Sequence, residues 1–282
     1  MISTGSISVL IFRSKFFKLT YMQRIWFNAL MKKILLALLI TVSLNTFGAI
    51  SILSDLDDTI KITQSSGEPG DLVGMRVFTG MPGFLEATKD YTNELHVLSA
   101  SPSIMRSHIS NIFKKYKIDV KSLTLRDDIF EDKFQYKVRE IKKILNRTSD
   151  DFILIGDDLG EDPEVYAEIV HLYPNRILAS YIHVINDRFI SHLNLTRFYT
   201  TSELYLREFT AGRMIGSRVM KGLEEVMAET RMEFIFPRRA YCPKTDKVWR
   251  WQYQTMFSLE AMVLSDKFTD YCGLRQSVII IP

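Results

Sequence analysis

The chain has 282 residues, a length that allows one large domain or two small ones. Hydrophobic residues make up 46% of it and aromatic residues 12%, so the composition excludes an intrinsically disordered protein. Six of the 36 basic residues lie in residues 1–48, which contain no acidic residue. The other 30 basic residues are balanced by 33 acidic ones, and this balance predicts no binding of nucleic acid.

The stretch MKKILLALLITVSLNTFGA, which begins at Met31, has the order of regions of a secretory signal peptide. Two lysines precede an apolar run, and small residues follow near Gly48 and Ala49. The run is short for a membrane span, although an uncleaved N-terminal anchor is the alternative. We therefore expect residues 1–30 to be an upstream extension, residues 31–48 to be a signal peptide, and the protein to be periplasmic or extracellular.

The chain contains two cysteines, Cys242 and Cys272. In an exported protein an even pair is compatible with one disulfide bond, which we expect here. Two reduced, buried cysteines are the alternative, because the sequence does not place the two Cα atoms within bridging distance.

Residues 49–190 alternate short apolar runs with helical patterns, which is typical of a parallel sheet with helices on both faces. Most of the apolar runs are continuous, as in strands that are buried on both faces. The predicted strands are residues 49–55, 95–101, 122–127, 152–158 and 176–184. The predicted helices are residues 81–91, a helix capped by Ser101-Pro102 that extends to Tyr116, a helix that begins near Lys137, and one that begins at Asp162-Pro163. We expect an α/β, doubly wound (Rossmann-like) fold.

Residues 191–282 form a predicted, mainly helical C-terminal region that packs on or covers the sheet domain. Residues 202–231 predict one helix, in which Gly212 and Gly216 allow close packing against a neighbour. The apolar face of this helix is expected to contain Ile215, Val219, Leu223 and Val226. Residues 232–282 are rich in aromatic residues and are expected to be irregular, except that the stretch VWRWQYQTMF is compatible with a helix or a strand.

Reactive side chains follow the predicted strands at their carboxyl ends. Asp55 ends the first strand, Asp57 lies two positions later, and Ser99 ends the second strand. Asp157 ends the fourth strand, and Lys137 lies in the helix before it. In an open parallel sheet the carboxyl ends of the strands form the ligand-binding edge, so we expect these side chains to lie close together.

This set of side chains suits phosphoryl transfer. One carboxylate can attack phosphorus, while a second donates and accepts protons. Carboxylates and a phosphate repel one another unless cations lie nearby. Mg²⁺, which prefers oxygen ligands, and a lysine would supply the positive charge.

The motif D-x-D-x-T at Asp55, Asp57 and Thr59, followed by the serine, lysine and aspartates, resembles the haloacid dehalogenase superfamily of phosphatases. Five stretches resemble more closely the catalytic domain of the actin-patch-associated phosphatidate phosphatases and their bacterial relatives: SDLDDTIK, GMPGFLEATKDY, LSASP, KVREIKKIL and IGDDLGEDPEVYAEI. They cover about residues 50–185. The resemblance implies a Mg²⁺-dependent phosphatase domain, an aspartyl-phosphate intermediate and a minimal cap over the site.

The resemblance also implies a role for each site residue. Asp55 would be the nucleophile and Asp57 the general acid and base. Ser99 would bind the phosphoryl group, and Lys137 would neutralise its charge, with Lys133 as the alternative lysine. The implied metal ligands are Asp55, Asp57 through its backbone carbonyl, Asp157 and Asp162. The implied substrate-binding residues are Thr59, which steadies the loop, Lys61 and Ser99.

Some of these assignments have alternatives. Asp162 is equally suited to an ordinary helix cap, and Lys61 either reaches the phosphate or faces water. Asp58 is interpreted as a turn residue beside the site. The family has G-D-S-G where this chain has GDDL at residues 156–159, so Asp158 adds a charge and puts the exact substrate in doubt.

About 40 residues separate the first two motifs, which leaves room for only a short flap and a helix over the site. A site with little cover suits phosphatidate or a related lipid phosphate, with peripheral membrane contact. The alternatives are an exported phosphatase for soluble phosphomonoesters, or a non-catalytic lipid-binding or protein-binding module on the same fold. Four C-terminal aromatic residues either contact a lipid interface or belong to the core: Trp249, Trp251, Tyr253 and Phe257.

Overall fold

A computed structural model describes residues 49–188, 190, 193 and 195–277. Contacts divide the chain into two units, Met1–Gly48 and Ala49–Pro282, and all the described residues lie in the second. The predicted upstream extension and signal peptide lie outside the described residues and stay predictions. Among the described residues, no helix has both the length and the hydropathy needed to cross a membrane.

The fold is built on a six-stranded sheet in the order β3-β2-β1-β4-β5-β6, in which every neighbouring pair is parallel. The strands are β1 (Ile50–Ser54), β2 (Thr92–Pro102), β3 (Ser122–Arg126), β4 (Asp151–Asp157), β5 (Ile177–His183) and β6 (Thr196–Phe198). The doubly wound α/β prediction is confirmed. The three-residue β6 was not predicted, because it is too short to produce an apolar run.

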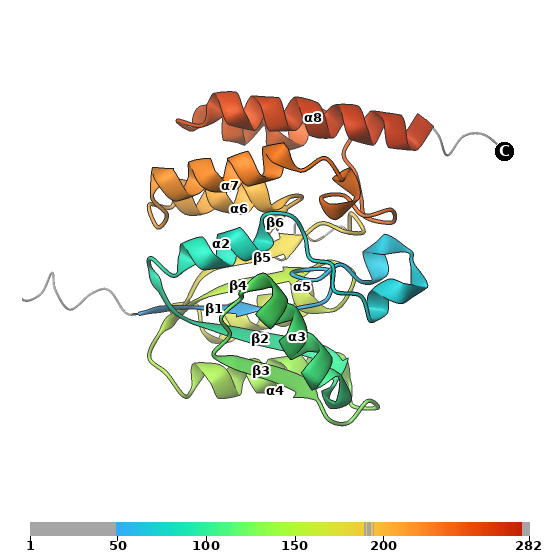
Figure 1. Cartoon of the computed structure of the whole chain (residues 1–282). Helices are drawn as coiled ribbons and strands as arrows, with labels where there is room; N and C mark the ends of the chain where they lie inside the picture. Colours follow the sequence, from blue (N-terminus) through green and yellow to red (C-terminus); the bar gives the residue numbers. More distant parts are fainter. Residues whose placement is uncertain (1–48, 189, 191–192, 194, 278–282) are drawn as a thin grey trace, which may run out of the picture. The chain divides into compact units, whose positions relative to one another are not determined.

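Helices cover both faces of the sheet (Figure 1). The α-helices are α2 (Met81–Thr88), α3 (Arg106–Tyr116), α4 (Lys133–Leu145), α5 (Asp162–Leu172), α6 (Thr201–Thr210), α7 (Gly216–Ala228) and α8 (Ser258–Ser277). Short 3₁₀ segments are η1 (Gln64–Ser66), η2 (Pro69–Leu72), η3 (Ser103–Met105), η5 (Met232–Phe234) and η6 (Asp246–Gln254).

Successive residues of the central strands enter two different hydrophobic cores. Ile52 of β1 and Val97 of β2 pack with α2, α3, α6 and α7 on one face. Leu53 and Leu98, the next residues of the same strands, pack with α4 and α5 on the other face. Side chains of a strand alternate between the two faces, and both faces are covered, which explains the continuous apolar runs of the sequence.

The segment 202–231 is not one helix, as predicted, but two. Helix α6 ends at Thr210, and Gly212 adopts a left-handed conformation with φ of 72° before α7 begins at Gly216. The expected close packing at Gly212 and Gly216 was wrong. An added Cβ would meet nothing within 4 Å at Gly212, and at Gly216 it would meet only the rings of Phe257 at 3.5 Å and Phe209 at 3.9 Å, which are ordinary contact distances. Ile215 precedes α7 and is exposed, so it does not belong to the buried face of that helix.

The prediction that residues 232–282 are irregular was also wrong, because they contain the 20-residue helix α8. This helix lies against α7 and η6 (Figure 1). The disulfide Cys242–Cys272 joins the segment before η6 to α8, with a distance of 5.3 Å between the two Cα atoms. Trp249 and Phe257 are buried in the core rather than presented to solvent.

Candidate active site

The predicted site residues meet at the carboxyl edge of the sheet. Asp55 directly follows β1, Asp157 ends β4, and Ser99 lies near the end of β2. They line a cleft of about 300 Å³ together with Asp57 and Lys137. This edge is where ligands bind in open parallel sheets, so the topology and the chemistry of the residues agree.

Three buried carboxylates form an acidic cluster, which we define as Asp55, Asp157 and Asp162. One oxygen from each lies within 4.8 Å of the others, so together they could hold a metal ion. Burial raises the pKa of both Asp55 and Asp157 well above the ordinary value, because the charged carboxylate loses its hydration. The cluster therefore needs nearby positive charge to stay ionised.

Lys137 supplies part of that charge. Its Nζ donates to Oδ1 of Asp55 at 2.7 Å and also to Oδ1 of Asp162. Burial opposes the charged ammonium, but the carboxylates of Asp162 and Asp55 outweigh it and raise the pKa of Lys137 above its ordinary value. Lys133, the alternative lysine, is exposed at the start of α4 and lines the cleft without reaching the cluster.

The second carboxylate of the cluster, Asp157, is held by the backbone of the loop after β4. Its Oδ1 accepts hydrogen bonds from the backbone N–H of Leu159 at 2.7 Å and of Gly160 at 3.3 Å. Thr59 donates its hydroxyl to Oδ2 at 3.4 Å, which fits the predicted steadying role of that residue.

Gly156 allows the third carboxylate to approach β4 closely. An added Cβ at Gly156 would lie 2.6 Å from Oδ2 of Asp162. The same oxygen accepts the backbone N–H of Asp157 at 3.3 Å. Asp162 is the first residue of α5, but its side chain lies in the cluster rather than acting as an ordinary helix cap.

Asp57 lies outside the acidic cluster. Its Oδ2 accepts hydrogen bonds from Ser99 Oγ at 3.1 Å and from Ser101 Oγ at 2.7 Å. Lys61 is buried, and its Nζ lies 3.7 Å from Oδ1 of Asp57, so Lys61 is directed at the site and not at water. Burial lowers the pKa of Lys61, against the opposing effect of Asp57 and Asp58.

The predicted helix cap at Ser101 and Pro102 was wrong. Ser101 and Pro102 do not begin a helix, because both still belong to β2, and α3 begins at Arg106 after η3. The hydroxyl of Ser101 binds Asp57, which lies 44 positions earlier in the chain. The repeated serine in LSASP was the one signal in the sequence that could have identified it.

Asp58 is a turn residue, as predicted, with φ of 57°, but its carboxylate does more than occupy a turn. It accepts the backbone N–H groups of Thr63, Gln64 and Ser65 at 3.0, 2.9 and 3.1 Å. The hydroxyls of Thr63 and Ser65 donate to it at 2.6 and 2.5 Å. Asp58 therefore fixes the loop that follows the first motif.

Asp158 has an equivalent role for the loop after β5. Its carboxylate accepts the backbone N–H groups of Ile185 and Asn186, both at 2.7 Å, and of Arg188 at 3.0 Å. The extra charge of the GDDL sequence is thus used to hold the loop after β5.

Sequence reasoning missed Arg126, a buried arginine at the end of β3 that also lines the cleft. Its Nη1 donates to the carbonyl of Glu131 at 2.8 Å. Its buried Nε has no hydrogen-bond partner among the described residues. Arg126 adds a positive charge to the cleft that neither motif indicated.

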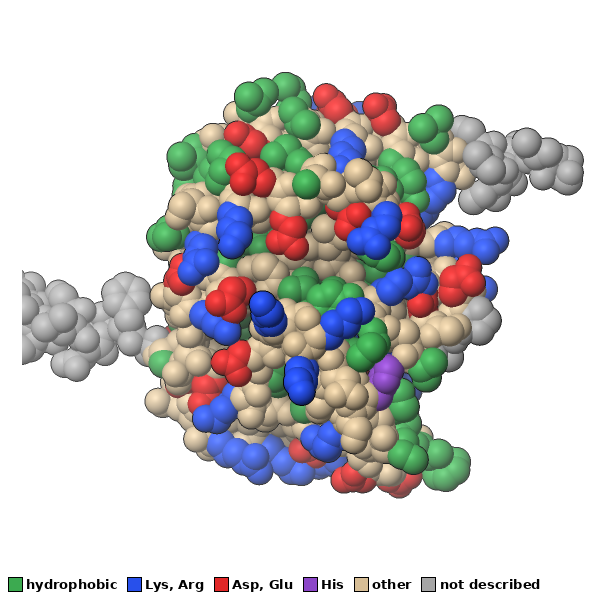
Figure 2. Space-filling model, viewed as in Figure 1, with side chains coloured by type: hydrophobic (Ala, Val, Ile, Leu, Met, Phe, Trp, Pro, Cys, Tyr) green, Lys and Arg blue, Asp and Glu red, His purple; other side chains and the backbone are tan. Residues whose placement is uncertain are grey.

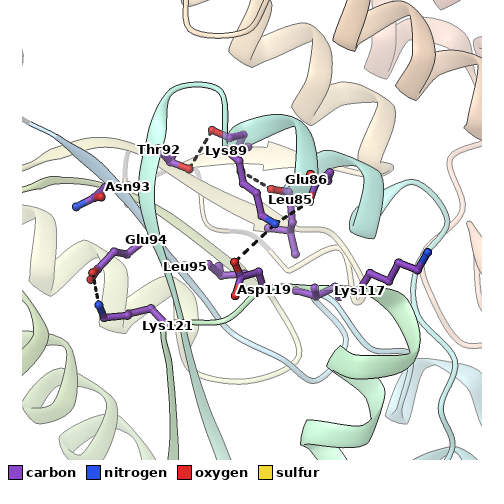
Figure 3. Close-up of a pocket in the computed structure, with 12 residues that line it drawn as sticks. Leu85, Glu86, Lys89, Thr92, Asn93, Glu94, Leu95, Lys117, Asp119 and Lys121 are labelled. Carbon is purple, nitrogen blue, oxygen red and sulfur yellow. Dashed lines mark hydrogen bonds and ion pairs between the residues drawn. The ribbon is translucent and has the colours of Figure 1, made fainter.

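A second cavity, of about 320 Å³, lies near the beginning of β2 and not near the cluster (Figure 3). Its charged side chains neutralise one another. Lys89 lies 2.8 Å from Glu86 and 3.8 Å from Asp119, and Lys121 lies 2.7 Å from Glu94. We assign the chemistry to the cleft at the carboxyl edge, where the charges remain concentrated.

Comparison with known proteins agrees with this geometry. Residues 50–184 match the family described as "Phosphatidate phosphatase APP1, catalytic domain". The match extends from β1 to the residue after β5 and includes every predicted site residue. No curated protein matches the chain. Residues 50–184 are therefore similar to the catalytic domain of the phosphatidate phosphatase APP1 family, and this similarity indicates a phosphatase.

Proposed function

We propose that the chain is a Mg²⁺-dependent phosphatase that hydrolyses a phosphate monoester through an aspartyl-phosphate intermediate, with phosphatidate or a related lipid phosphate as its substrate. The observation that carries the proposal is the position of Asp55. It lies at the carboxyl edge of β1, within the acidic cluster and in contact with Lys137. An ionised, positioned carboxylate is the group that can attack phosphorus.

The acidic cluster fits Mg²⁺ in charge and in chemistry. Three buried carboxylates face one lysine, so the site favours a further cation, and carboxylate oxygens are the ligands that Mg²⁺ prefers. Asp55, Asp157 and Asp162 would hold the ion. When bound, Mg²⁺ would offset the negative charge of the phosphoryl group and so allow a carboxylate to approach it.

The side chains divide the reaction between them. Asp55 would form a bond from a carboxylate oxygen to phosphorus, while the bond from phosphorus to the oxygen of the alcohol breaks. Asp57 would donate its proton to that leaving oxygen. In the second step Asp57 would remove a proton from water, whose oxygen attacks phosphorus and releases inorganic phosphate, which restores Asp55.

The surroundings of Asp57 support this acid and base role. Its side chain is 27% exposed, so water and the leaving group can reach it. The hydroxyls of Ser99 and Ser101 orient it by donating to Oδ2. Ser99 and Lys137 would bind the phosphoryl oxygens, and Arg126 and Lys61 would add positive charge around them.

The family match supports a lipid phosphate as the substrate. A soluble phosphomonoester is the second candidate, because the residues at the cleft would contact the phosphate and the reacting oxygen regardless of the alcohol. Export to an oxidising compartment is a further part of the proposal. It is supported by the disulfide Cys242–Cys272, since disulfides persist in such compartments.

The purified protein should release phosphate from a chromogenic monoester and from phosphatidate when Mg²⁺ is present. We expect the Asp55→Asn variant to lose activity by roughly 10³-fold or more, because it lacks the nucleophile. EDTA should abolish wild-type activity, and added Mg²⁺ should restore it.

Asp119→Asn is the matched control, because this aspartate is exposed and lies in the second cavity, away from the cleft. It should retain wild-type activity. A wild-type protein that is inactive on both substrates, or an Asp55→Asn variant as active as the control, would refute the catalytic proposal.

A further inference from the structure

Four large hydrophobic side chains are exposed in the segments that directly follow β2, β3 and β4 at the carboxyl edge of the sheet. Ile104 is 88% exposed, Ile129 52%, Phe130 91% and Leu159 37%. They come from three separate segments: Ile104 lies in η3 after β2, Ile129 and Phe130 lie in the loop after β3, and Leu159 lies in the loop after β4. We call these four residues the apolar rim.

The apolar rim lies beside the catalytic cleft, next to residues that line it. Leu159 lines the cleft itself, and Ile104 lies two positions after Pro102, which also lines it. Ile129 and Phe130 lie in the loop between Arg126 and Lys133, both of which line the cleft. Figure 2 shows hydrophobic side chains protruding at the lower right of the molecule, on the side where Figure 1 shows β2 and β3 ending.

Hydrogen bonds hold the loop after β3 in a conformation that leaves Phe130 outside the core. The backbone N–H of Phe130 donates to Oδ1 of Asp128 at 2.9 Å, and that of Glu131 donates to the carbonyl of Asp128 at 3.2 Å. Arg126 binds the carbonyl of Glu131 at 2.8 Å. The exposure of Phe130 is therefore a feature of an ordered loop, and hydrophobic side chains presented in this way mark a binding surface.

We propose that the apolar rim inserts into the surface of a phospholipid bilayer and so brings the cleft to a lipid phosphate. This inference rests on the proposed function. A lipid phosphate carries its polar phosphate next to apolar chains, and the molecule has the same order, with a charged cleft bordered by apolar side chains. A soluble phosphomonoester would gain nothing from the rim.

The charges beside the rim indicate which kind of interaction binds the protein to the bilayer. Asp127, Asp128 and Asp132 are exposed beside the rim, whereas the exposed cations there are Arg106 and Lys133. This balance does not attract an anionic membrane. We therefore expect binding to come from burial of the apolar side chains, and to be retained at high salt.

The test compares a rim variant, Ile129→Ser with Phe130→Ser, and a control variant, Leu259→Ser with Met262→Ser. The control residues lie on α8 and are 63% and 44% exposed, so the same kind of change is made away from the cleft. Both full-length variants are compared with wild type by co-sedimentation with phosphatidylcholine vesicles, with and without a small fraction of phosphatidate. Thermal unfolding checks that both are folded.

We expect the rim variant to bind vesicles about tenfold more weakly and to hydrolyse phosphatidate in vesicles about tenfold more slowly. Its hydrolysis of p-nitrophenyl phosphate should be unchanged, and the control variant should match wild type in every assay. Vesicle binding by wild type should persist in about 0.5 M salt, because salt screens interactions between charges and does not weaken the burial of apolar side chains.

Equal vesicle binding by the rim variant and wild type would overturn the inference, as would an equal loss in the control variant. A wild-type dimer that dissociates in the rim variant, measured by sedimentation velocity, would assign the rim to a contact between copies and would also overturn it. Failure of wild type to hydrolyse any ester would instead refute the proposed function. The two outcomes can be distinguished, because co-sedimentation measures vesicle binding whether or not the protein hydrolyses a substrate.

Discussion

At the scale of single residues, the three acids of the first motif have separate tasks. Asp55 lies in the acidic cluster, Asp57 binds two serine hydroxyls, and Asp58 binds the loop at residues 63–65. Adjacent positions in a tight turn point their side chains in different directions, so closeness in sequence does not mean a shared role. The electrostatic repulsion between them is limited because each carboxylate has its own donors.

The loop anchored by Asp58 provides a test at this scale. In the Asp58→Asn variant one carboxylate oxygen is replaced by an NH₂ group, which cannot accept the hydrogen bonds of the buried N–H and hydroxyl donors. We expect the free energy of unfolding to fall by about 2–4 kcal/mol, measured by urea denaturation.

Asp119→Asn, an exposed change of the same kind, should alter the free energy of unfolding by less than about 0.5 kcal/mol. A loss for Asp58→Asn no larger than this would contradict the anchoring role of Asp58.

The sequence predicted part of the site at residue level for a clear reason. Asp55, Asp157 and Lys137 belong to local motifs at strand ends or in an amphipathic helix, and such positions can be identified from neighbouring residues. Arg126 has no such local signal, and Ser101 has only the repeated serine of LSASP. Their contacts depend on how the loops after β2 and β3 lie against Asp57 and Glu131.

At the scale of secondary-structure elements, α6 and α7 pack through a glycine that the sequence analysis did not single out. An added Cβ at Gly222 of α7 would lie 2.2 Å from Cζ of Tyr205 in α6. Tyr205 also contacts the ring of Phe84 in α2, with the ring centroids 5.3 Å apart. This glycine therefore sets the distance between three helices that cover one face of the sheet.

We expect Gly222→Ala to lower the free energy of unfolding by about 1–3 kcal/mol, because the new methyl group displaces the ring of Tyr205. Gly273→Ala in α8 is the matched control, since its Cβ would meet nothing within 4 Å. That change should raise stability by about 0.5–1 kcal/mol through better helix propensity. Urea denaturation of the two variants should give opposite signs, and a shared sign would contradict the packing argument.

The start of α6 predicts a pH effect. Glu203 forms a capping box with Thr200 and is fully buried, and burial raises its pKa to about 7. Between the ordinary glutamate value of 4.5 and about 7, the folded protein binds a proton that the unfolded chain has released. The stabilising contribution of this proton is complete below pH 4.5 and is lost as the pH rises through 7.

Glu203→Gln removes this titration and keeps an oxygen that can accept the capping hydrogen bonds. We therefore expect the difference in unfolding free energy between wild type and the variant to change by about 3 kcal/mol between pH 4.5 and pH 8, in favour of the variant at pH 8. Urea denaturation at several pH values measures it. A difference that does not vary with pH would show that Glu203 does not titrate in this range.

At the scale of the whole molecule, the C-terminal region completes the fold. Leu264 and Phe268 of α8 belong to the same hydrophobic core as Ile52 of β1 and Val97 of β2. The disulfide Cys242–Cys272 closes a loop in this region across a separation of 30 residues. Residues outside the matched family domain therefore share a core with the sheet that holds the site.

Replacing both cysteines by serine should lower the free energy of unfolding by about 3–4 kcal/mol, because the unfolded chain gains the freedom of an open loop of this length. The measurement is urea denaturation of wild type and of the double variant, each with and without a reducing agent. Reduction should weaken wild type and leave the double variant unchanged. A reducing agent that shifts both equally would indicate another cause.

The sequence by itself determined the parallel sheet and the acids at its carboxyl edge. Continuous apolar runs identify strands buried on both faces, and acids directly after them mark strand ends, so these signals depend only on neighbouring residues.

The tertiary structure alone decided the division of α6 from α7, the helix α8 and the partners of Ser101. Helix α8 carries apolar residues on its exposed side as well as its buried side, since Leu259, Met262 and Val263 are exposed while Leu264 is buried. Such a segment has no single apolar stripe from which a helix can be predicted. Contacts of this kind join residues far apart in the chain, and only the packed molecule brings them together.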